Sequence, residues 1–534
     1  MATATQQKAL GAFYTDEPVA QHLVRWAVRN ASDTVLDPSS GGGVFLDAAI
    51  GRLRALGNKI PVVWGIDLAP GATDPVRVSA NNLKVLHRDF FTIRPGEIPD
   101  FSAIVGNPPF VRYQTFNGAA RDRALDCARD AGVELPRLSS SWAPFLVHAT
   151  RFLKIGGRLG MVVPAELGHA QYAKGVLAYL LRQFSRVSVV MFRESLFPEL
   201  SEETYLLQCD GYGTPCKWLS VATSQNILQA EDAADRGLPA EIEAITSGKT
   251  RLAHYRVSLR ARKLYEGLSE MQGIVRFGEK ADIGIGYVTG CNDYFHLTER
   301  ERKDWRIPKR YLRRVILSLA ACDGVVLRDQ DWTRLRDLGE KAFLLHVPAE
   351  DGHTFTEGIA AYLKHGKHPA VHNRFKCRVR KQWYAVPHVR RGDALLSYMS
   401  GQIPRLVENR AGLFSPNTLH VVRFASKASA KSFIAGWHSS LTRLSCEMEG
   451  HALGGGMLKL EPTEAGRVTI PLPQAGEAAQ LVKQIDQLFR AGDSEKATEL
   501  IDRQILRKRF ALSAAECQLL QSAAEELREW RLHK

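Results

Sequence analysis

Four short apolar segments in the first 110 residues each end beside a carboxylate or amide side chain. They are residues 34–37, 61–67, 84–87 and 101–106, and the side chains are Asp37, Asp67, Asp89 and Asn107. The first segment runs into a glycine-rich turn and then an apolar-periodic stretch, which is the strand–turn–helix unit of an open parallel sheet. Ligands of such sheets lie at the carboxyl ends of the strands, so we expect these four side chains to share one site.

The glycine-rich turn spans residues 38–43. Glycine lets the backbone approach a ligand closely, and we expect Gly41 and Gly43 to do so. No phosphate-binding lysine follows the turn, and Asp37 stands at the end of the preceding strand. This combination favours a cationic or zwitterionic ligand over a nucleoside triphosphate.

The next two strand ends carry groups that suit a nucleoside. Asp67 stands where the acidic residue of a dinucleotide-type unit binds ribose hydroxyls. Asp89 can accept a hydrogen bond from an adenine amino group, and Phe90 can cover the ring. One acid at a strand end is common by chance, whereas three in succession beside a glycine turn indicate a ligand site.

The fourth strand ends in Asn107-Pro108-Pro109-Phe110. The two prolines fix φ and remove two backbone donors, so this corner is stiff and its carbonyl groups stay free. An exocyclic amine on a planar ring fits here. Its two N–H groups can donate to the Asn107 side-chain oxygen and the Pro108 carbonyl, while its ring stacks on Phe110. These bonds draw the nitrogen lone pair out of ring conjugation and make the nitrogen nucleophilic. The alternative interpretation of the Asn107–Phe110 stretch is a plain turn at the end of a strand.

Length and charge bound the class of protein. The chain has 534 residues, too many for one core, so two or three domains are expected. Its formal net charge of +14 favours a polyanionic partner, with a merely basic soluble enzyme as the alternative. The eight cysteines lack C-x-x-C spacing, so we expect no metal site, no disulfide framework and a reducing cytoplasm. We also expect no signal peptide and no membrane span.

Together these motifs resemble the gamma-class DNA adenine-N6 methyltransferases, the modification enzymes of Type II restriction systems. Phe13-Tyr14-Thr15 resembles motif X, residues 37–45 motif I, Asp67 motif II, Asp89-Phe90 motif III and residues 107–110 motif IV. The resemblance implies a Rossmann-like α/β domain that binds S-adenosylmethionine through Thr15, Asp37, Gly41, Gly43, Asp67, Asp89, Phe90 and Pro108. It also implies that Asn107, Pro108 and Phe110 hold the target base.

Two further stretches resemble family motifs, and two positions depart from the pattern. Residues 196–199 precede a predicted hairpin and resemble motif VIII, which implies that Phe197 stacks on the other face of the base; a loop Phe plugging the core is the alternative. Phe145 resembles the motif V aromatic near the cofactor adenine, and a core Phe is equally consistent. Asp67 stands where Glu is commoner, and Ser102 where Asp is usual.

The sequence pattern changes beyond about residue 222. We expect residues 1–223 to form the catalytic domain, 224–275 a helical connector, 276–473 an α+β target-recognition domain and 474–534 a C-terminal helical segment. The glycine-spaced residues 283–295 resemble the start of the family's recognition domain. Apolar spacing predicts helices at residues 478–490 and 496–532.

Residues 364–391 form the most basic segment and also carry aromatic side chains. Such interleaving suits phosphate contacts and groove entry, which favours DNA binding over a solvated hairpin. The predicted DNA contacts are Arg374, Lys376, Arg378, Arg380, Lys381 and Trp383. Arg112 and Tyr113 directly follow the corner and are placed to touch the DNA backbone, with a solvated insertion equally consistent.

We therefore expect a site-specific methyltransferase that acts on N6 of an adenine flipped out of double-stranded DNA. Cytosine-N4 methylation is the first alternative, although Ser more often replaces Asn107 there. RNA guanine-N2 and protein-glutamine methyltransferases also use Asn-Pro-Pro loops but lack the motif X start, and a DNA-binding subunit without activity would need a broken cofactor loop. The segment before motif X is too short for a nuclease. We expect a prokaryotic enzyme that works as a monomer on DNA beside a separately encoded restriction endonuclease.

Overall fold

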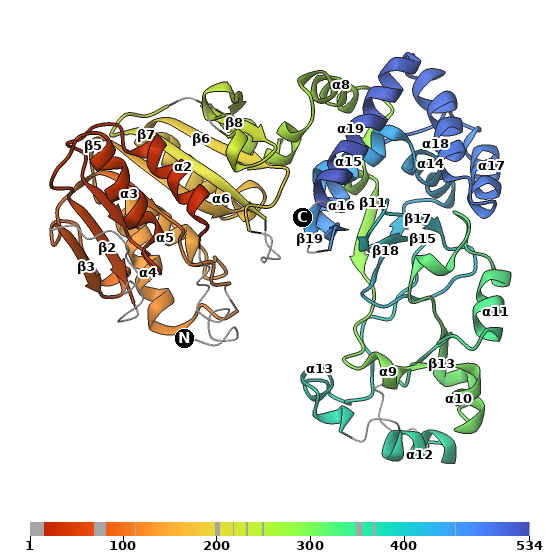
Figure 1. The fold of residues 1–534 in the computed structure, drawn as a ribbon. Coiled ribbons are helices and arrows are strands. Elements are labelled where there is room, and N and C mark those ends of the chain that lie inside the picture. Colours follow the sequence, from red (N-terminus) through yellow and green to blue (C-terminus); the bar gives the residue numbers. More distant parts are fainter. Residues whose placement is uncertain are drawn as a thin grey trace. The chain divides into compact units, whose positions relative to one another are not determined.

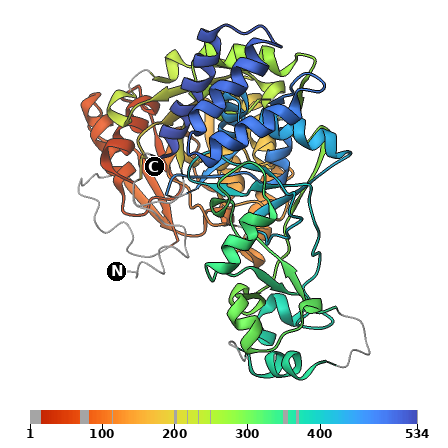
Figure 2. The same ribbon diagram turned by 90° about the vertical axis from the view of Figure 1, so that its right-hand side faces the viewer.

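The computed structural model describes residues 15–68, 82–112, 114–197, 203–216, 218–230, 233–247, 250–348, 355–366, 370–453 and 455–532. These residues form two compact units, which divide between Arg256 and Val257. Figures 1 and 2 draw the first unit in red to yellow-green and the second in green to blue. No helix in the described ranges is both long and apolar enough to cross a membrane.

A nine-stranded sheet is the centre of the first unit. Its strands are β1 (Val35–Asp37), β2 (Val63–Asp67), β3 (Leu83–His87), β4 (Phe101–Gly106), β5 (Leu153–Pro164), β6 (Phe184–Phe192), β7 (Thr204–Tyr212), β8 (Trp218–Ser224) and β9 (Leu238–Glu241). The spatial order is β3-β2-β1-β4-β5-β7-β6-β8-β9; β1 to β5 are parallel to one another, and β7 runs antiparallel to both β5 and β6. This arrangement confirms the predicted Rossmann-like class I methyltransferase domain.

The parallel strands bring the predicted polar side chains to one edge of the sheet. β1 pairs with β2 on one side and with β4 on the other. Asp37 and Asp67 end β1 and β2, and Asn107 directly follows β4. Because parallel strands end at the same edge, the three side chains belong to one end of the sheet, where ligands of this fold lie.

Helices cover both faces of this sheet (Figure 1). α2 (Glu17–Ala27) and α3 (Val44–Ala55) pack together on one face, whereas α5 (Trp142–Thr150) and α6 (Ala173–Gln183) lie on the other. α2 is amphipathic, with Val19, Leu23 and Ala27 among its buried residues. All nine residues of α5 are buried, so this helix is packed on every side. The unit also contains α4 (Gly118–Asp130) and α7 (Ile242–Ser247).

The predicted helical connector at residues 224–275 is instead divided between the two units. β9 pairs antiparallel with β8 and so extends the catalytic sheet to Glu241. α8 (Leu259–Ser269) belongs to the second unit, and Ser258 caps it by accepting a hydrogen bond from the amide of Ala261. β9 is a four-residue strand at the edge of the sheet, too short for its sequence to show an alternating strand pattern.

An antiparallel four-stranded sheet lies between two apolar cores in the second unit. Its strands, in spatial order, are β11 (Ala281–Ile285), β18 (Leu419–Phe424), β15 (Ala394–Ser397) and β17 (Leu406–Glu408). Successive side chains of a strand point to opposite faces. Accordingly, Ala394 and Leu396 belong to one core and Leu395 to the other. The predicted α+β class of this half is confirmed.

The C-terminal helices share the core of Ala394 and Leu396. The helices of this core include α14 (Lys427–Trp437), α15 (Ser440–Glu449), α16 (Pro462–Arg467), α17 (Ala478–Arg490), α18 (Ser494–Ile501) and α19 (Ala514–Leu532). The side chain of Asp486 on α17 is 1% exposed and accepts hydrogen bonds from the amide of Val326 at 2.9 Å and from Nε of Arg490 at 3.0 Å. The predicted C-terminal segment 474–534 is therefore joined to the preceding residues by buried contacts.

Shorter elements build the other core. They are β12 (His296–Leu297), β13 (Leu312–Arg314), β14 (Phe343–Leu345), α9 (Asn292–Phe295), α11 (Asp329–Asp337), α12 (Glu357–His365) and α13 (Phe375–Arg378). The polar helix α10 (Glu299–Asp304) has no buried residue. Further pairings join β10 (Ile274–Arg276) to β21 (Thr469–Pro471), and β20 (Met457–Lys459) to β16 (Met399–Ser400) and β19 (His451–Leu453). Within this unit, α9, α10, α12 and α13 lie at the end opposite to α14 and α17 (Figures 1 and 2).

Candidate active site

The end of β1 carries a buried carboxyl group. Asp37 is 1% exposed, and its Oδ1 accepts a hydrogen bond from the amide of Ser39 at 3.0 Å. Its Oδ2 has no hydrogen-bond partner among the described residues. Burial raises the pKa of Asp37 to about 8; the Ser39 amide opposes this shift, and the charge of Asp67 adds to it. A cationic ligand group would supply the missing partner.

Glycines shape the backbone around this carboxyl group. Gly41 has φ of +45°, and its amide donates to Oδ2 of Asp67 at 2.8 Å, which ties the glycine turn to β2. Gly43, with φ of +81°, precedes α3. A Cβ on Gly106 would lie only 2.8 Å from Oδ1 of Asp37. Glycine at position 106 is therefore required by the close approach of β1 and β4.

The Asn107 corner presents free acceptor atoms. The side-chain nitrogen of Asn107 donates to Oγ1 of Thr15 at 3.2 Å, and the hydroxyl of Ser39 donates to the Asn107 carbonyl at 3.1 Å. The side-chain oxygen of Asn107 is buried and accepts no hydrogen bond from any residue that the structure describes. Thr15 thus holds the side-chain amide and Ser39 the backbone carbonyl, which leaves the side-chain oxygen of Asn107 for a ligand.

Ser141 fixes the other side of the corner. Its hydroxyl donates to the carbonyl of Pro109 and accepts from the amide of Val111 at 2.9 Å, and its own amide donates to the Val111 carbonyl at 3.0 Å. Within the described part of the chain, the Pro108 carbonyl accepts no hydrogen bond. Phe110 is buried, with 7% exposure. The corner therefore offers two unpaired oxygens, those of Asn107 and Pro108, next to an aromatic ring.

The motif III pair is held by contacts that the sequence did not indicate. Asp89 accepts from the amide of Phe91 at 3.0 Å and from Arg123 on α4 at 2.8 Å, so both of its oxygens already have donors. The Phe90 ring packs against the Phe145 ring with 4.9 Å between ring centroids, and Phe90 is 4% exposed. The predicted contacts of Asp89 and Phe90 with an adenine must share these groups with Arg123 and the aromatic core.

His148 holds the loop at Phe90 and Ile93. Its Nε2 lies 3.0 Å from the carbonyl oxygen of Ile93 and 3.3 Å from that of Phe90. Burial lowers the pKa of His148 to about 4, so the ring is neutral and its Nε2–H donates. Position 148 lies on the fully buried α5 and belongs to no motif, so this role could not be predicted from the sequence.

A second group of missed residues lies where α5 begins and β5 ends. Nε1 of Trp142 donates to Oε2 of Glu166 at 3.0 Å, and the hydroxyl of Tyr172 donates to the same oxygen at 2.5 Å. Trp142 directly follows Ser141, which holds the corner. No motif marks Trp142, Glu166 or Tyr172, because contacts across 24 residues leave no periodic pattern in the sequence.

For several predicted site residues, the structure shows the position but no contact that tests their role, and others lie outside the described residues. Phe197 is 5% exposed on the segment after β6, and its amide donates to Oγ of Ser195 at 3.2 Å. Arg112 is exposed directly after the corner. Phe13, Tyr14 and Tyr113 lie outside the described residues. The structure therefore leaves the stacking of Phe197 on a base as a prediction.

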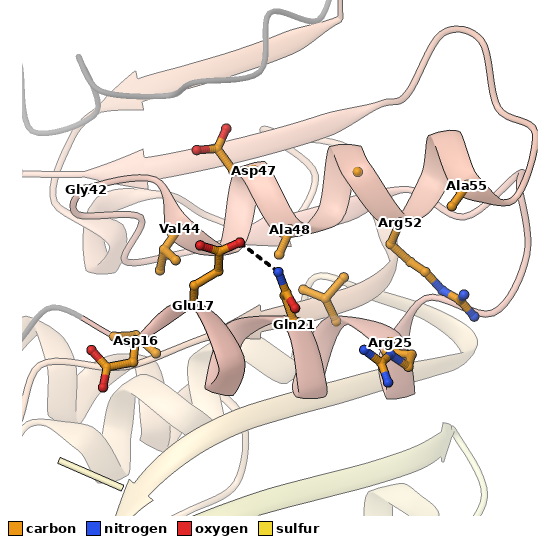
Figure 3. A pocket seen from close by; sticks show the side chains of 13 residues that line it. Asp16, Glu17, Gln21, Arg25, Gly42, Val44, Asp47, Ala48, Arg52 and Ala55 are labelled. Atoms are coloured by element: carbon orange, nitrogen blue, oxygen red, sulfur yellow. Dashed lines mark hydrogen bonds between the residues drawn. The ribbon is translucent and has the colours of Figure 1, made fainter. Parts of the chain in front are cut away.

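An open pocket of about 730 Å³ lies between α2 and α3. Asp16 and Gly42 lie at one end of it, and Arg25 and Arg52 line it farther along (Figure 3). Thr15 also belongs to the lining. Glu17 accepts a hydrogen bond from Gln21 at 2.7 Å along its wall (Figure 3). The lining includes neither Asp37 nor Asn107. This pocket thus adjoins the strand-end site at Thr15 and the glycine turn without being that site.

Known proteins match this chain over most of its length. The model of the Eco57I restriction-modification methylases matches residues 70–197, and that of the C-terminal domain of the Type II methyltransferase M.Eco57I matches residues 249–506. The chain belongs to the Type II restriction-modification methyltransferases. It is a DNA methyltransferase, and the predicted membership of the Type II restriction-modification enzymes is confirmed.

Individual relatives of this Type II methyltransferase are distant. M.AccI from Acinetobacter calcoaceticus is 19% identical over 86% of this chain and 85% of its own length. M.HindII from Haemophilus influenzae is 24% identical over 54% of this chain and 56% of its own length. The structure of the Type IIL restriction-modification enzyme MmeI in complex with DNA covers 99% of this chain and 80% of its own, with a TM-score of 0.56 and 12% identity. This last likeness supports the fold.

S-adenosylmethionine is the cofactor of this methyltransferase, as predicted. The strand-end residues fit it. Asp37 offers a buried oxygen without a partner, Asp67 adds a second carboxylate, and Gly106 leaves the space that a Cβ would fill. When bound, the cofactor supplies a methyl group on a positively charged sulfur.

The predicted DNA contacts of this methyltransferase fall into two groups. Arg374, Lys376, Arg378 and Lys381 are exposed. Arg380, by contrast, donates to the carbonyls of Val288 at 2.8 Å and Thr289 at 2.7 Å, and Trp383 packs against Tyr294 with 5.6 Å between ring centroids. Arg380 and Trp383 thus make contacts within the second unit, and their contact with DNA stays a prediction.

Proposed function

We propose that this methyltransferase transfers a methyl group from S-adenosylmethionine to N6 of an adenine at a specific sequence in double-stranded DNA. The observation that carries the proposal is the pair of unpaired oxygens at the corner, the side-chain oxygen of Asn107 and the carbonyl of Pro108. An exocyclic amine has two N–H donors, and two acceptors on a rigid corner match that number.

The chain's own residues would act by positioning. Thr15 occupies the amide nitrogen of Asn107 at 3.2 Å, so the oxygen faces the amine, and Ser141 keeps the proline loop in place. With both N–H groups donated, the nitrogen lone pair is directed away from the ring. Fixing this geometry replaces a bimolecular encounter and lowers the barrier by several kcal/mol, in the range of about 7–11 kcal/mol for well-oriented groups.

The base must leave the duplex for this contact, because N6 is paired and stacked within it. We propose that Phe110 and Phe197 stack on its two faces. Aromatic side chains bind the π-face of a base with little dependence on its identity, whereas the acceptor pair selects for an exocyclic amine. The cofactor contacts predicted for Thr15, Asp37, Gly41, Gly43, Asp67, Asp89, Phe90 and Pro108 belong to the same proposal.

Cytosine-N4 methylation is the second candidate, since the same acceptor pair fits the amine of cytosine. Nucleoside mass spectrometry of DNA from bacteria that express the protein separates the two outcomes: we expect N6-methyladenine, and N4-methylcytosine alone would contradict the proposal. Sequencing of the modified bases would give the recognition sequence. We also propose that the enzyme acts as a monomer and that a separately encoded endonuclease cuts unmodified DNA.

The role of the corner is tested by Asn107→Ala. We expect methyl transfer to fall by about 100-fold or more, as when one stabilising group of an active site is removed. Calorimetry should show that S-adenosylmethionine still binds, because the side-chain oxygen of Asn107 faces the base. Equal losses of cofactor binding and methyl transfer would contradict this assignment.

A further inference from the structure

The short helix α13 presents apolar side chains to solvent. Phe375 is 63% exposed and Val379 is 61% exposed, and they stand four residues apart. Three basic residues flank them, namely Arg374, Lys376 and Arg378, and all three are exposed. We call these five residues the α13 tip. Single exposed apolar residues are ordinary, whereas a pair on one side of a helix surrounded by cations calls for an explanation.

Contacts with residues 288–289 hold the α13 tip in place. Cys377, the buried residue of α13, lies with its Sγ 3.7 Å from the carbonyl oxygen of Thr289. The guanidinium of Arg380 donates to the carbonyls of Val288 and Thr289. Cys377 of α13 and Arg380, two residues after the helix, therefore make three hydrogen bonds to residues 288–289.

Gly290 makes this close approach possible. Its φ is +81°, and a Cβ at this position would lie 2.9 Å from Cβ of Lys376 and 3.1 Å from Sγ of Cys377. A glycine here thus serves the docking of α13, which explains one of the glycines in the segment 283–295. Because the backbone is clamped, Phe375 and Val379 are displayed in a fixed arrangement.

The charges of the tip are not used inside the protein. Within the described ranges, Arg374, Lys376 and Arg378 form no ion pair; the charge of Lys376 lies 5.8 Å from the centre of the Phe375 ring. Three unpaired cations around a small apolar patch suit two rows of phosphates with base edges between them. Two apolar side chains offer far less area than a stable protein interface needs, so the charge pattern favours DNA over a protein partner.

We propose that the α13 tip enters a groove of double-stranded DNA, with Phe375 and Val379 against the bases and Arg374, Lys376 and Arg378 on the phosphates. The inference rests on the proposed function and adds to it a base-contacting apolar pair. Apolar side chains can contact thymine methyl groups or wedge between base steps, and both contacts depend on sequence. The contacts of the three basic residues with phosphates, by contrast, do not depend on the DNA sequence.

The apolar half is tested with Phe375→Ser and Val379→Ser in the full-length protein. The probes are two labelled duplexes, one with the methylated sequence found in expressing cells and one without it, compared by fluorescence anisotropy. We expect each variant to bind the first duplex about ten-fold more weakly and the second almost unchanged. Leu338→Ser is the matched control, because Leu338 is 72% exposed in the same unit but outside the tip.

The basic half is tested with Arg374→Gln, Lys376→Gln and Arg378→Gln. Each should weaken binding to both duplexes and reduce the slope of log affinity against log salt by about 0.9. Wild-type affinity of Phe375→Ser and Val379→Ser for both duplexes would overturn the inference. A wild-type protein that methylates no DNA would instead overturn the proposed function, so the two failures are distinguishable.

Discussion

The side-chain nitrogen of Asn107 donates a hydrogen bond to Oγ1 of Thr15 at 3.2 Å, and this bond decides which end of the amide faces the site. The two residues are 92 positions apart in the sequence, at the start of α2 and the end of β4. Without the bond, the amide could rotate and present its donor to an amine that also carries only donors. Thr15 therefore acts on the orientation of Asn107 in addition to its predicted contact with the cofactor.

The first prediction concerns this bond. Thr15→Val keeps the shape of the side chain and removes the acceptor, so we expect the single-turnover rate of methyl transfer to fall about ten-fold. Thr15→Ser keeps the hydroxyl and should stay within about two-fold of the wild type. A Thr15→Val enzyme with an unchanged rate would show that Asn107 is oriented by other groups.

The second prediction concerns Gly106. In Gly106→Ala the added Cβ meets Oδ1 of Asp37 at 2.8 Å, so β1 and β4 must shift at the cofactor site. We expect the affinity for S-adenosylmethionine, measured by calorimetry, to fall about ten-fold or more. The control is Gly175→Ala on α6, where a Cβ meets nothing within 4 Å. It should leave cofactor affinity unchanged and stabilise the helix by about 1 kcal/mol.

The third prediction concerns pH. The folded pKa of Asp37 is about 8 against an ordinary value of 3.8, so the cofactor-free folded protein retains a proton that the unfolded chain loses. The titration of Asp37 therefore lowers the free energy of unfolding as pH rises from about 4 to about 8. A cationic cofactor favours the ionised carboxylate, so cofactor affinity should rise with pH across the upper part of this window.

Asp37→Asn provides the comparison for that pH dependence. The amide does not titrate, so both the loss of stability towards about pH 8 and the gain in cofactor affinity should be smaller in this variant. Urea unfolding and calorimetry at about pH 6 and about pH 9 would measure the two effects. Identical pH profiles for the wild type and Asp37→Asn would assign the dependence to another group.

The fourth prediction concerns the buried network of Asp486. Its carboxylate joins α17 to the amide of Val326 and also accepts from Arg490 on the same helix, which in turn binds Asp331 at 2.8 Å. Asp486→Ala would leave the buried amide of Val326 without its acceptor and remove one carboxylate partner from Arg490. It should lower the free energy of unfolding of the second unit by about 1–3 kcal/mol in urea. Asp493→Ala removes a 41%-exposed partner of Lys496 and should change it by less than about 1 kcal/mol.

Helices and strand ends that are set by the spacing of apolar residues could be predicted from the sequence. α17 has the predicted bounds, Ala478–Arg490, because its apolar face repeats at helical spacing. The ends of β1, β2 and β4 were found because each short apolar run stops at a polar residue or a proline corner. The same reasoning placed Asp37, Asp67 and Asn107 at one edge of the sheet, since the topology of parallel strands leaves little choice.

The rest depends on contacts that no local pattern records. The bond of Ser141 to Pro109 spans 32 residues, and that of Trp142 to Glu166 spans 24. Arg378 and Arg380 look alike in a basic segment, but only Arg380 turns back onto the carbonyls of Val288 and Thr289. Whether a cation serves the fold or a partner is decided by the loop it meets, which sequence spacing does not specify.

α5 has every residue buried and begins directly after Ser141, the residue that pins the Pro109 carbonyl. Close-packed interiors respond to the loss or gain of a single methylene, so we expect volume-changing substitutions along this helix to move its first turn and the proline corner with it. Selection for heat resistance and selection for turnover therefore act on the same nine residues. Substitutions accumulated there in evolution should come in compensating sets, each restoring the position of a single hydroxyl group.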